Sequence, residues 1–265
     1  MELSIIDNQL LYRIMAIPTC SGHETMMPEF ILNFAKGNDL EVNVDTYGNV
    51  YVRKGVLPIG DYYPCVTAHL DTVHNNQVAW INEHKLLDVV TEEENGRHKL
   101  YCVGTGIGAD DKAGIVICLT LLLKLPFLKA VFCVEEECGC HGSERVDLLW
   151  FKDVGYIIGF DAPGWTASKV LGGIRLFSRN FYEKYLKEME SEFDLVDYRN
   201  HSYADALMLR MNTSLVCMNM CAGFYNYHTR DEYCIVEEMN KAAKLGIYLI
   251  NKLGYKEYVE DIEKI

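Results

Sequence analysis

The sequence is short of positive charge: 25 lysines and arginines stand against 38 aspartates and glutamates, which gives a formal net charge of −13. Nucleic-acid-binding proteins need concentrated lysine and arginine to neutralise phosphates, so this balance argues against a nucleic-acid partner. The sequence also lacks the roughly eighteen uninterrupted apolar residues that a membrane-spanning helix requires. Its longest apolar run, residues 115–123, predicts a buried helix instead. We therefore expect neither a nucleic-acid nor a membrane partner.

The N-terminus has no basic segment followed by an apolar stretch and a small-residue cleavage site, which is the pattern of a secretory signal. We therefore expect a cytoplasmic protein. The ten cysteines fit this expectation, because they are spread over a mid-sized chain and several lie inside apolar runs. No internal repeat, low-complexity tract or flexible linker divides the sequence, so we expect a single domain over residues 1–265.

Alternation of apolar and polar segments predicts the fold class. Two helices are expected over residues 5–16 and 25–36, and the alternating segment 41–55 predicts a hairpin or two exposed strands. Further along, apolar runs alternate with helical stretches, which indicates an α/β fold: a mostly parallel central sheet with helices on both faces. The expected strands cover residues 63–70, 130–137, 155–161 and 214–221, and the expected helices start at Lys112, lie near 143–150 and 180–193, and end the chain at 236–253.

Metal-binding side chains follow these apolar runs at the points where the expected strands end. In open α/β sheets, the carboxyl ends of the strands meet at one edge, where active sites form. An acidic pair also precedes the helix that begins at Lys112, where the helix N-terminus favours anions. Together these positions supply two imidazoles and at least three carboxylates: His69, Asp110 or Asp111, a glutamate of the run 135–137, Asp161 and His228.

This ligand set predicts a zinc site. Imidazole nitrogens and carboxylate oxygens are usual zinc ligands, and their number here exceeds the needs of one four-coordinate catalytic ion. We therefore expect two zinc ions bridged by one carboxylate, with cobalt or manganese as possible substitutes. Asp71 is expected to accept a hydrogen bond from the second ring nitrogen of His69 and so to orient that ligand. The glutamate run offers one carboxylate to a metal and a neighbouring one as a general base.

The order of these motifs resembles the zinc-dependent exopeptidases, a clan that includes peptidase T, the aminoacylases and the glutamate carboxypeptidases. The segments TAHLDTV, GIGADDKAG and EEECGCHGS are similar to the first metal motif, the bridging motif and the glutamate motif of that clan. The segments GFDAPG and GFYNYHTRDEY resemble its fourth and fifth motifs, so the similarity extends over nearly the whole chain. The resemblance implies a phosphorylase/hydrolase-like α/β catalytic domain.

The resemblance also assigns roles to individual residues. It implies that Asp110, rather than Asp111, bridges the two metals, and that a cis peptide bond follows it. It implies that Glu136 is the general base and that Glu137 is a ligand. The ligand pairs that it implies are His69 with Asp161 on one metal, and Glu137 with His228 on the other.

Many relatives insert a lid-like domain after the strand that carries the equivalent of Asp161. Here the interval to His228 must already hold a helix, a strand and their connections, so we expect a catalytic domain without the lid. Stabilisation of the oxyanion would then fall to the metals, helped by Tyr225 or Tyr227.

The motifs closest to peptidase T favour an aminopeptidase that acts on di- or tripeptides. Two alternatives stay open. A carboxypeptidase or an N-acyl amino acid amidohydrolase would use the same site, and a metal-bound binding module would need no catalysis. Glu136 argues against the binding module, because metal binding alone does not require that carboxylate.

Two further groups of residues are interpreted without a functional role. The segment Cys138-Gly-Cys140 lacks a second cysteine pair and the Cys-x-x-Cys spacing, so we interpret it as ordinary loop rather than as a redox or third metal site. Five other histidines lie in polar segments and are expected to be exposed: His74, His84, His98, His141 and His201.

Overall fold

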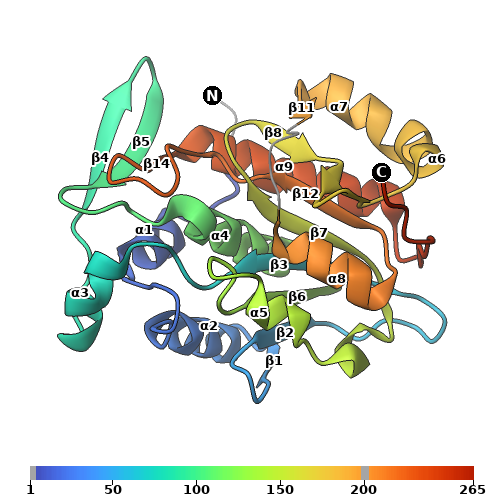
Figure 1. Ribbon diagram of the computed structural model, residues 1–265, viewed down its shortest axis with the longest axis horizontal. Coiled ribbons are helices and arrows are strands. Elements are labelled where there is room, and N and C mark those ends of the chain that lie inside the picture. Colours follow the sequence, from blue (N-terminus) through green and yellow to red (C-terminus); the bar gives the residue numbers. More distant parts are fainter. Residues whose placement is uncertain (1–3, 198–202) are drawn as a thin grey trace.

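The structure is a computed structural model that describes residues 4–197 and 203–265. Its centre is an eight-stranded sheet with the strand order β1-β2-β6-β3-β7-β12-β8-β11 (Figure 1). The four middle strands run parallel: β6 (Leu128–Cys133), β3 (Tyr63–His69), β7 (Val154–Ala162) and β12 (Cys217–Cys221). The flanking strands add antiparallel pairs: β1 (Glu41–Val44), β2 (Val50–Lys54) and β8 (Thr166–Ser168), with β11 (Val196–Asp197) parallel to β8. The predicted α/β fold with a mostly parallel sheet is confirmed.

Helices cover the centre of this sheet. One group consists of α4 (Ala109–Lys124), which packs on β3 and β7, together with α9 (Val236–Leu253) and α1 (Asn8–Ala16). A second group consists of α8 (Asp205–Thr213), which packs on β7 and β12, and α5 (His141–Glu144). Every residue of β3 and β7 is buried, so both faces of the sheet are covered at its centre.

Most helix bounds agree with the sequence, and the differences have local causes. The first helix begins at Asn8 instead of residue 5, because the Asp7 side chain caps it by accepting a hydrogen bond from the Leu10 amide. The second, α2, covers Met26–Gly37, and α9 covers the predicted range. The helix expected near 180–193 is a composite of α6 (Arg179–Phe181), a π-helical turn (Tyr182–Leu186) and α7 (Lys187–Phe193).

Two sequence expectations need correction. The helix expected near 143–150 is split into α5 and a 3-10 turn (Leu148–Phe151), because Asp147 between them caps the second piece through the Leu149 amide. Strands β1 and β2 form the expected hairpin, but the alternative of two exposed strands is wrong for β2. That strand lies between β1 and β6 in the sheet, and Val50, Tyr51 and Val52 are buried.

A smaller antiparallel sheet was not predicted, and it helps to place the site. It has the order β13-β14-β5-β4, with β13 (Phe224–Tyr225), β14 (Tyr233–Ile235), β5 (Arg97–Cys102) and β4 (Val89–Glu94). The hairpin of β4 and β5 projects at the upper left of Figure 1. Since β14 pairs with β5, this sheet anchors the loop between β13 and β14, which carries His228. The remaining small elements are a 3-10 turn (Asn75–Gln77), α3 (Val78–Asn82), β9 (Val170–Leu171) and β10 (Ile174–Arg175).

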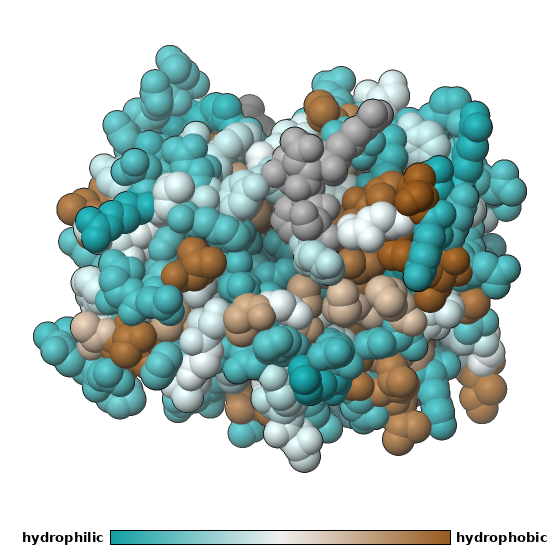
Figure 2. All heavy atoms as spheres, viewed as in Figure 1, coloured by the Kyte–Doolittle hydropathy of each residue, from teal (hydrophilic) through white to brown (hydrophobic). Residues whose placement is uncertain are grey.

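The face shown in Figure 2 is mainly hydrophilic, and its apolar residues gather mostly toward the right-hand side. Within the two described ranges, no helix has both the length and the apolar character needed to cross a membrane.

Candidate active site

The structure brings all five predicted metal ligands together. His69 is the last residue of β3, and Asp161 is the penultimate residue of β7. Glu137 follows the end of β6, and His228 lies in the loop between β13 and β14. The fifth, Asp110, lies in the non-helical first turn of α4. Segments that are far apart in the sequence therefore meet at the carboxyl end of the parallel strands, as expected for an open α/β sheet.

Asp110 faces a different histidine with each of its carboxylate oxygens. Its Oδ1 lies 3.1 Å from Nε2 of His69, and its Oδ2 lies 3.3 Å from Nε2 of His228. Oδ1 of Asp161 lies 3.8 Å from the same His69 nitrogen, and Oε2 of Glu137 lies 3.0 Å from the same His228 nitrogen. The predicted ligands thus form two sets of close contacts, His69 with Asp161 and His228 with Glu137, and Asp110 contacts the histidine of each set.

The neighbouring Asp111 is engaged differently. Its carboxylate lies close to His69 and Asp161, but its oxygens accept hydrogen bonds from the main-chain amides of His69 (3.2 Å) and Gly114 (3.0 Å). These bonds tie the end of β3 to the start of α4. The peptide bond between Asp110 and Asp111 is cis, as the resemblance implied.

The position of Asp71 partly corrects the sequence expectation. Nδ1 of His69 lies 3.0 Å from the main-chain oxygen of Asp71 and 3.4 Å from its carboxylate, so the carbonyl is the nearer acceptor. The carboxylate instead accepts hydrogen bonds from the amides of Glu136 (3.0 Å) and Glu137 (3.1 Å) and from the hydroxyl of Ser21 (2.7 Å). Asp71 therefore orients His69 and also fixes the main chain of both glutamates.

Burial and crowding shift the acid–base properties of the site. Burial, opposed by the charge of His69 and reinforced by nearby carboxylates, raises the pKa of Glu136 to about 8. Burial and the charge of Asp110 raise the pKa of Asp161 well above its ordinary value. Burial also opposes ionisation of Asp110, but hydrogen bonds with His228 and His69 outweigh it and lower the pKa of Asp110. The site thus holds several carboxylates whose negative charge is not fully balanced by positive groups.

Two buried carboxylate oxygens without hydrogen-bond partners indicate what kind of group could bind in the site. Oε1 of Glu137 and Oδ2 of Asp161 are buried and have no hydrogen-bond partner. A buried carboxylate oxygen without a partner is costly, and a bound cation removes that cost. The donors are imidazole nitrogens and carboxylate oxygens, which suit zinc and related divalent ions. The residues present therefore fit a divalent metal in each of the two sets.

A contact between His74 and Glu232 was missed, because the prediction that His74 is exposed was wrong. His74 is buried, and its Nε2 lies 2.5 Å from Oε2 of Glu232. The Glu232 carboxylate also accepts hydrogen bonds from the amides of Gly108 (2.8 Å) and Asp110 (2.9 Å). The partners are distant in the sequence, so no local pattern reveals the pair. Among the other four histidines, His84 and His98 are exposed, His141 is partly exposed, and His201 lies outside the described residues.

A second buried carboxylate near the site also escaped the sequence analysis. Asp205 begins α8, and its buried carboxylate lies next to the side chains of Ser143 and Cys133. Burial raises the pKa of Asp205 to about 6, and its charge in turn contributes to the raised pKa of Glu136. The start of α8 was not predicted, so no sequence pattern placed this carboxylate near the site.

The tyrosines proposed to assist the metals have other contacts. The hydroxyl of Tyr225 donates a hydrogen bond to Glu238 at 2.6 Å, so the structure gives it no oxyanion role. The ring of Tyr227 lies edge-on to His228, with 4.9 Å between the ring centroids, and so buttresses a predicted ligand.

Comparisons with known proteins agree with this geometry. The chain is 28% identical over 161 residues to the cytosol non-specific dipeptidase of Escherichia coli, an alignment that covers 57% of this chain and 33% of that protein. It therefore spans about a third of the length of this curated relative. No protein-family model matches the chain.

Solved structures resemble the whole fold. The aminopeptidase PepT of Bacillus cereus has a TM-score of 0.70 at 14% identity, with 94% of this chain and 99% of that chain covered. A tripeptidase of Staphylococcus aureus gives the same TM-score and identity, with 93% and 98% covered. The chain has the fold of these peptidases. The resemblance to zinc exopeptidases that the motifs predicted is thus confirmed at the level of the fold.

Proposed function

We propose that the chain is a dinuclear-metal exopeptidase that removes N-terminal residues from short peptides. One observation carries the proposal: Asp110 lies between His69 and His228 with one carboxylate oxygen toward each. This is the arrangement that a bridging carboxylate needs. Together with Asp161 and Glu137, it would let each of two metals be held by an imidazole, a carboxylate and Asp110.

Two zinc ions, or cobalt or manganese in their place, would lower the pKa of a water molecule and polarise the substrate carbonyl. The protein's own contribution is to fix the donors. His69 is oriented by the carbonyl oxygen of Asp71, and Asp110 is held by the carboxylate of Glu232 through its amide. Such supporting contacts fix the direction of a ligand and its basicity.

Glu136 is proposed as the general base. It takes a proton from the attacking water and later returns it to the leaving amine. Burial and nearby carboxylates raise the pKa of Glu136 above its ordinary value, so this carboxylate holds a proton more readily than an exposed glutamate does. The hydrogen bond from its amide to Asp71 holds Glu136 beside the ligand Glu137.

The substrate class rests on the comparisons and the motifs. An aminopeptidase and a tripeptidase share the fold, and the curated relative is a dipeptidase, so di- and tripeptides are the proposed substrates. The name of that relative, a cytosolic enzyme, supports the proposal that this chain works in the cytoplasm. We further propose that residues 1–265 act as a single catalytic domain without an inserted lid.

A peptide panel tests the proposal. The protein, dialysed against a chelator and then supplied with zinc or cobalt, should release the N-terminal residue from di- and tripeptides that have a free amine. Blocking the amine by acetylation should abolish the cleavage. Cleavage of the acetylated peptides alone would reassign the site to an amidohydrolase or a carboxypeptidase. Metal binding without hydrolysis of any peptide would support a binding module and overturn the proposal.

A further inference from the structure

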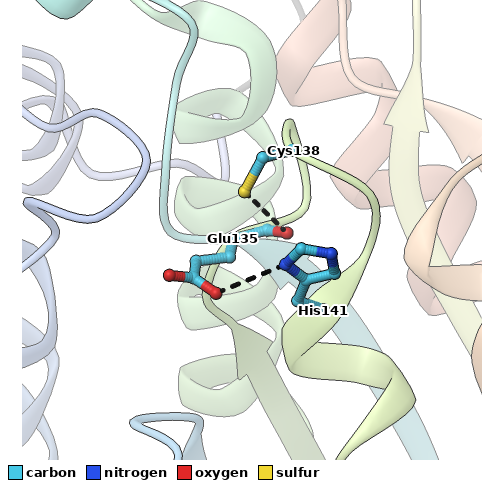
Figure 3. A group of neighbouring side chains, drawn as sticks. All are labelled: Glu135, Cys138 and His141. Carbon is cyan, nitrogen blue, oxygen red and sulfur yellow. Dashed lines mark hydrogen bonds and ion pairs between the residues drawn. The ribbon is translucent and has the colours of Figure 1, made fainter.

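The loop that carries Glu136 and Glu137 has a second cluster of metal-ligating side chains. The cluster consists of Glu135, Cys138 and His141, whose side chains lie close together on this loop, as Figure 3 shows. Nδ1 of His141 lies 3.6 Å from Oε2 of Glu135, and Sγ of Cys138 lies 3.7 Å from the main-chain oxygen of Glu135. One ligand atom from each of the three side chains lies within 4.8 Å of the other two. None of the three belongs to the proposed catalytic set.

The backbone holds these side chains together. The amides of Gly139 and Cys140 donate hydrogen bonds to the carbonyl of Glu136 at 2.9 and 2.8 Å, and the amide of His141 donates to the carbonyl of Glu135 at 3.0 Å. These bonds close a tight turn in which every third residue, at 135, 138 and 141, supplies a ligand. The turn is therefore formed before any ion binds, which lowers the entropic cost of binding.

Two neighbours fix the orientation of the ligands. The hydroxyl of Tyr47 donates a hydrogen bond to Oε2 of Glu135, which leaves Oε1 of that carboxylate available. Gly139 has a φ of +125°, and a Cβ there would approach Nε2 of His141 at 3.3 Å. A glycine at this position thus provides both the backbone conformation and the room for the imidazole.

The charge around the cluster favours a cation. The carboxylates of Asp71, Glu135 and Glu24 place negative charge around Cys138. Among the ten cysteines Cys138 is the exposed one, so an ion in solution can reach it. Sulfur, imidazole and carboxylate together match the borderline-soft character of zinc and disfavour magnesium and calcium, which prefer oxygen ligands alone.

We propose that Glu135, Cys138 and His141 form a third divalent-metal site, selective for zinc, on the outer side of the loop that carries Glu136 and Glu137. Binding replaces the thiol proton of Cys138, which passes to solvent, and water completes the coordination. Ligand atoms around a tetrahedral zinc lie about 3.5 Å apart, given bond lengths of about 2.0–2.3 Å. The nitrogen and oxygen of His141 and Glu135 already lie at about this spacing, at 3.6 Å, and all three ligand atoms lie within 4.8 Å of one another. This revises the interpretation of Cys138 as an ordinary loop residue.

Cobalt titration of the full chain tests the site separately from the catalytic proposal. The proposed catalytic ligands contain no sulfur, so thiolate-to-cobalt charge-transfer absorption in the near ultraviolet reports a cysteine ligand. We expect this absorption in the wild type, its loss in Cys138→Ser, and its retention in Cys140→Ser. Added zinc should abolish it by displacing cobalt, because zinc ordinarily binds such sites more tightly, whereas magnesium should not.

Histidine variants complete the test. His141→Ala should weaken cobalt binding at this site by at least about tenfold, while His98→Ala, an exposed histidine elsewhere, should leave it unchanged. His228→Ala, which removes a proposed catalytic ligand, should keep the absorption even where peptidase activity is lost. The proposal is overturned by absorption that survives Cys138→Ser, by its absence from the wild type, or by equal effects of His141→Ala and His98→Ala.

Discussion

The carboxylate of Glu232 holds Asp110 through the main chain rather than through its side chain. Oε1 of Glu232 accepts a hydrogen bond from the Asp110 amide at 2.9 Å, and Oε2 accepts from the Gly108 amide at 2.8 Å. Buried His74 lies against the same carboxylate. Both carboxylate oxygens of Asp110 are thereby left to face His69 and His228. A residue outside the proposed ligand set thus fixes the position of the bridging carboxylate.

Glu232→Gln should therefore weaken metal binding without removing a ligand. The glutamine keeps one acceptor oxygen but presents an NH₂ group to one of the two amides, so a buried amide loses its partner. We expect a loss of about 10–100-fold in metal affinity, the usual range for supporting residues. Competition with a chromophoric chelator measures it. Asp231→Asn, an exposed neighbour, is the matched control, and equal affinities of the two variants would refute the role of Glu232.

Glu136→Gln should separate catalysis from metal binding. Loss of the base should reduce turnover by roughly 10²–10⁴-fold, because general-base catalysis contributes an effect of that size. Metal content, measured by elemental analysis, should stay at the wild-type value. Glu144→Gln, an exposed glutamate of the same segment, should keep wild-type turnover. Unchanged turnover in Glu136→Gln would show that another group accepts the proton.

His228→Ala should lose metal. The imidazole of His228 lies against both Asp110 and Glu137, so its removal takes one nitrogen donor from that set. We expect the purified variant to retain about one metal ion fewer than the wild type in the two-metal site. The control is His98→Ala, which removes an exposed histidine paired with Glu237 away from the site. Full metal content in His228→Ala would exclude it as a ligand.

Asp45 gives a prediction for stability that is independent of metals. Burial opposes its ionisation, but hydrogen bonds from Tyr51, Asn49 and Gly48 outweigh this effect and lower the pKa of Asp45 below 3.8. Because the folded-state pKa is depressed, the stabilisation is present above the unfolded-state value and is lost as pH falls through the folded-state value. In Asp45→Asn the remaining oxygen can still accept from the main-chain amide of Gly48, but the NH₂ group cannot accept the bonds from the side chains of Tyr51 and Asn49.

We therefore expect Asp45→Asn to lower the free energy of unfolding by about 1–3 kcal/mol at pH 7. The difference from the wild type should shrink once the pH falls below the ordinary aspartate value. Urea denaturation of both proteins at neutral and acid pH measures it. A difference that widens on acidification would contradict the assignment of a lowered pKa.

The sequence predicted those site residues that lie at or just after the ends of parallel strands. Continuous apolar runs indicate buried parallel strands, and parallel strands deliver the residues after them to one edge of the sheet. This physical rule is enough to bring His69, Glu137 and Asp161 together. The bridging role of Asp110 and the cis bond after it needed the family resemblance, because neither spacing nor composition specifies them.

The parts that the sequence missed depend on contacts across long separations or on exact side-chain placement. The bond between His74 and Glu232 joins residues 158 positions apart, and a histidine in a polar segment gives no sign of its burial. The acceptor nearest to Nδ1 of His69 is the main-chain oxygen of Asp71 rather than its carboxylate, a detail of placement that no sequence pattern specifies. The hairpin of β4 and β5 is an exception, because it was missed although its turn, Asn95-Gly96, is a local sequence signal for a hairpin.

The most direct test of the central claim is an anomalous-scattering map of crystals of the zinc-loaded protein. The account predicts two zinc peaks roughly 3.5–4 Å apart, with Asp110 between them, His69 and Asp161 on one side, and Glu137 and His228 on the other. A single peak among these five side chains, or none, would contradict it.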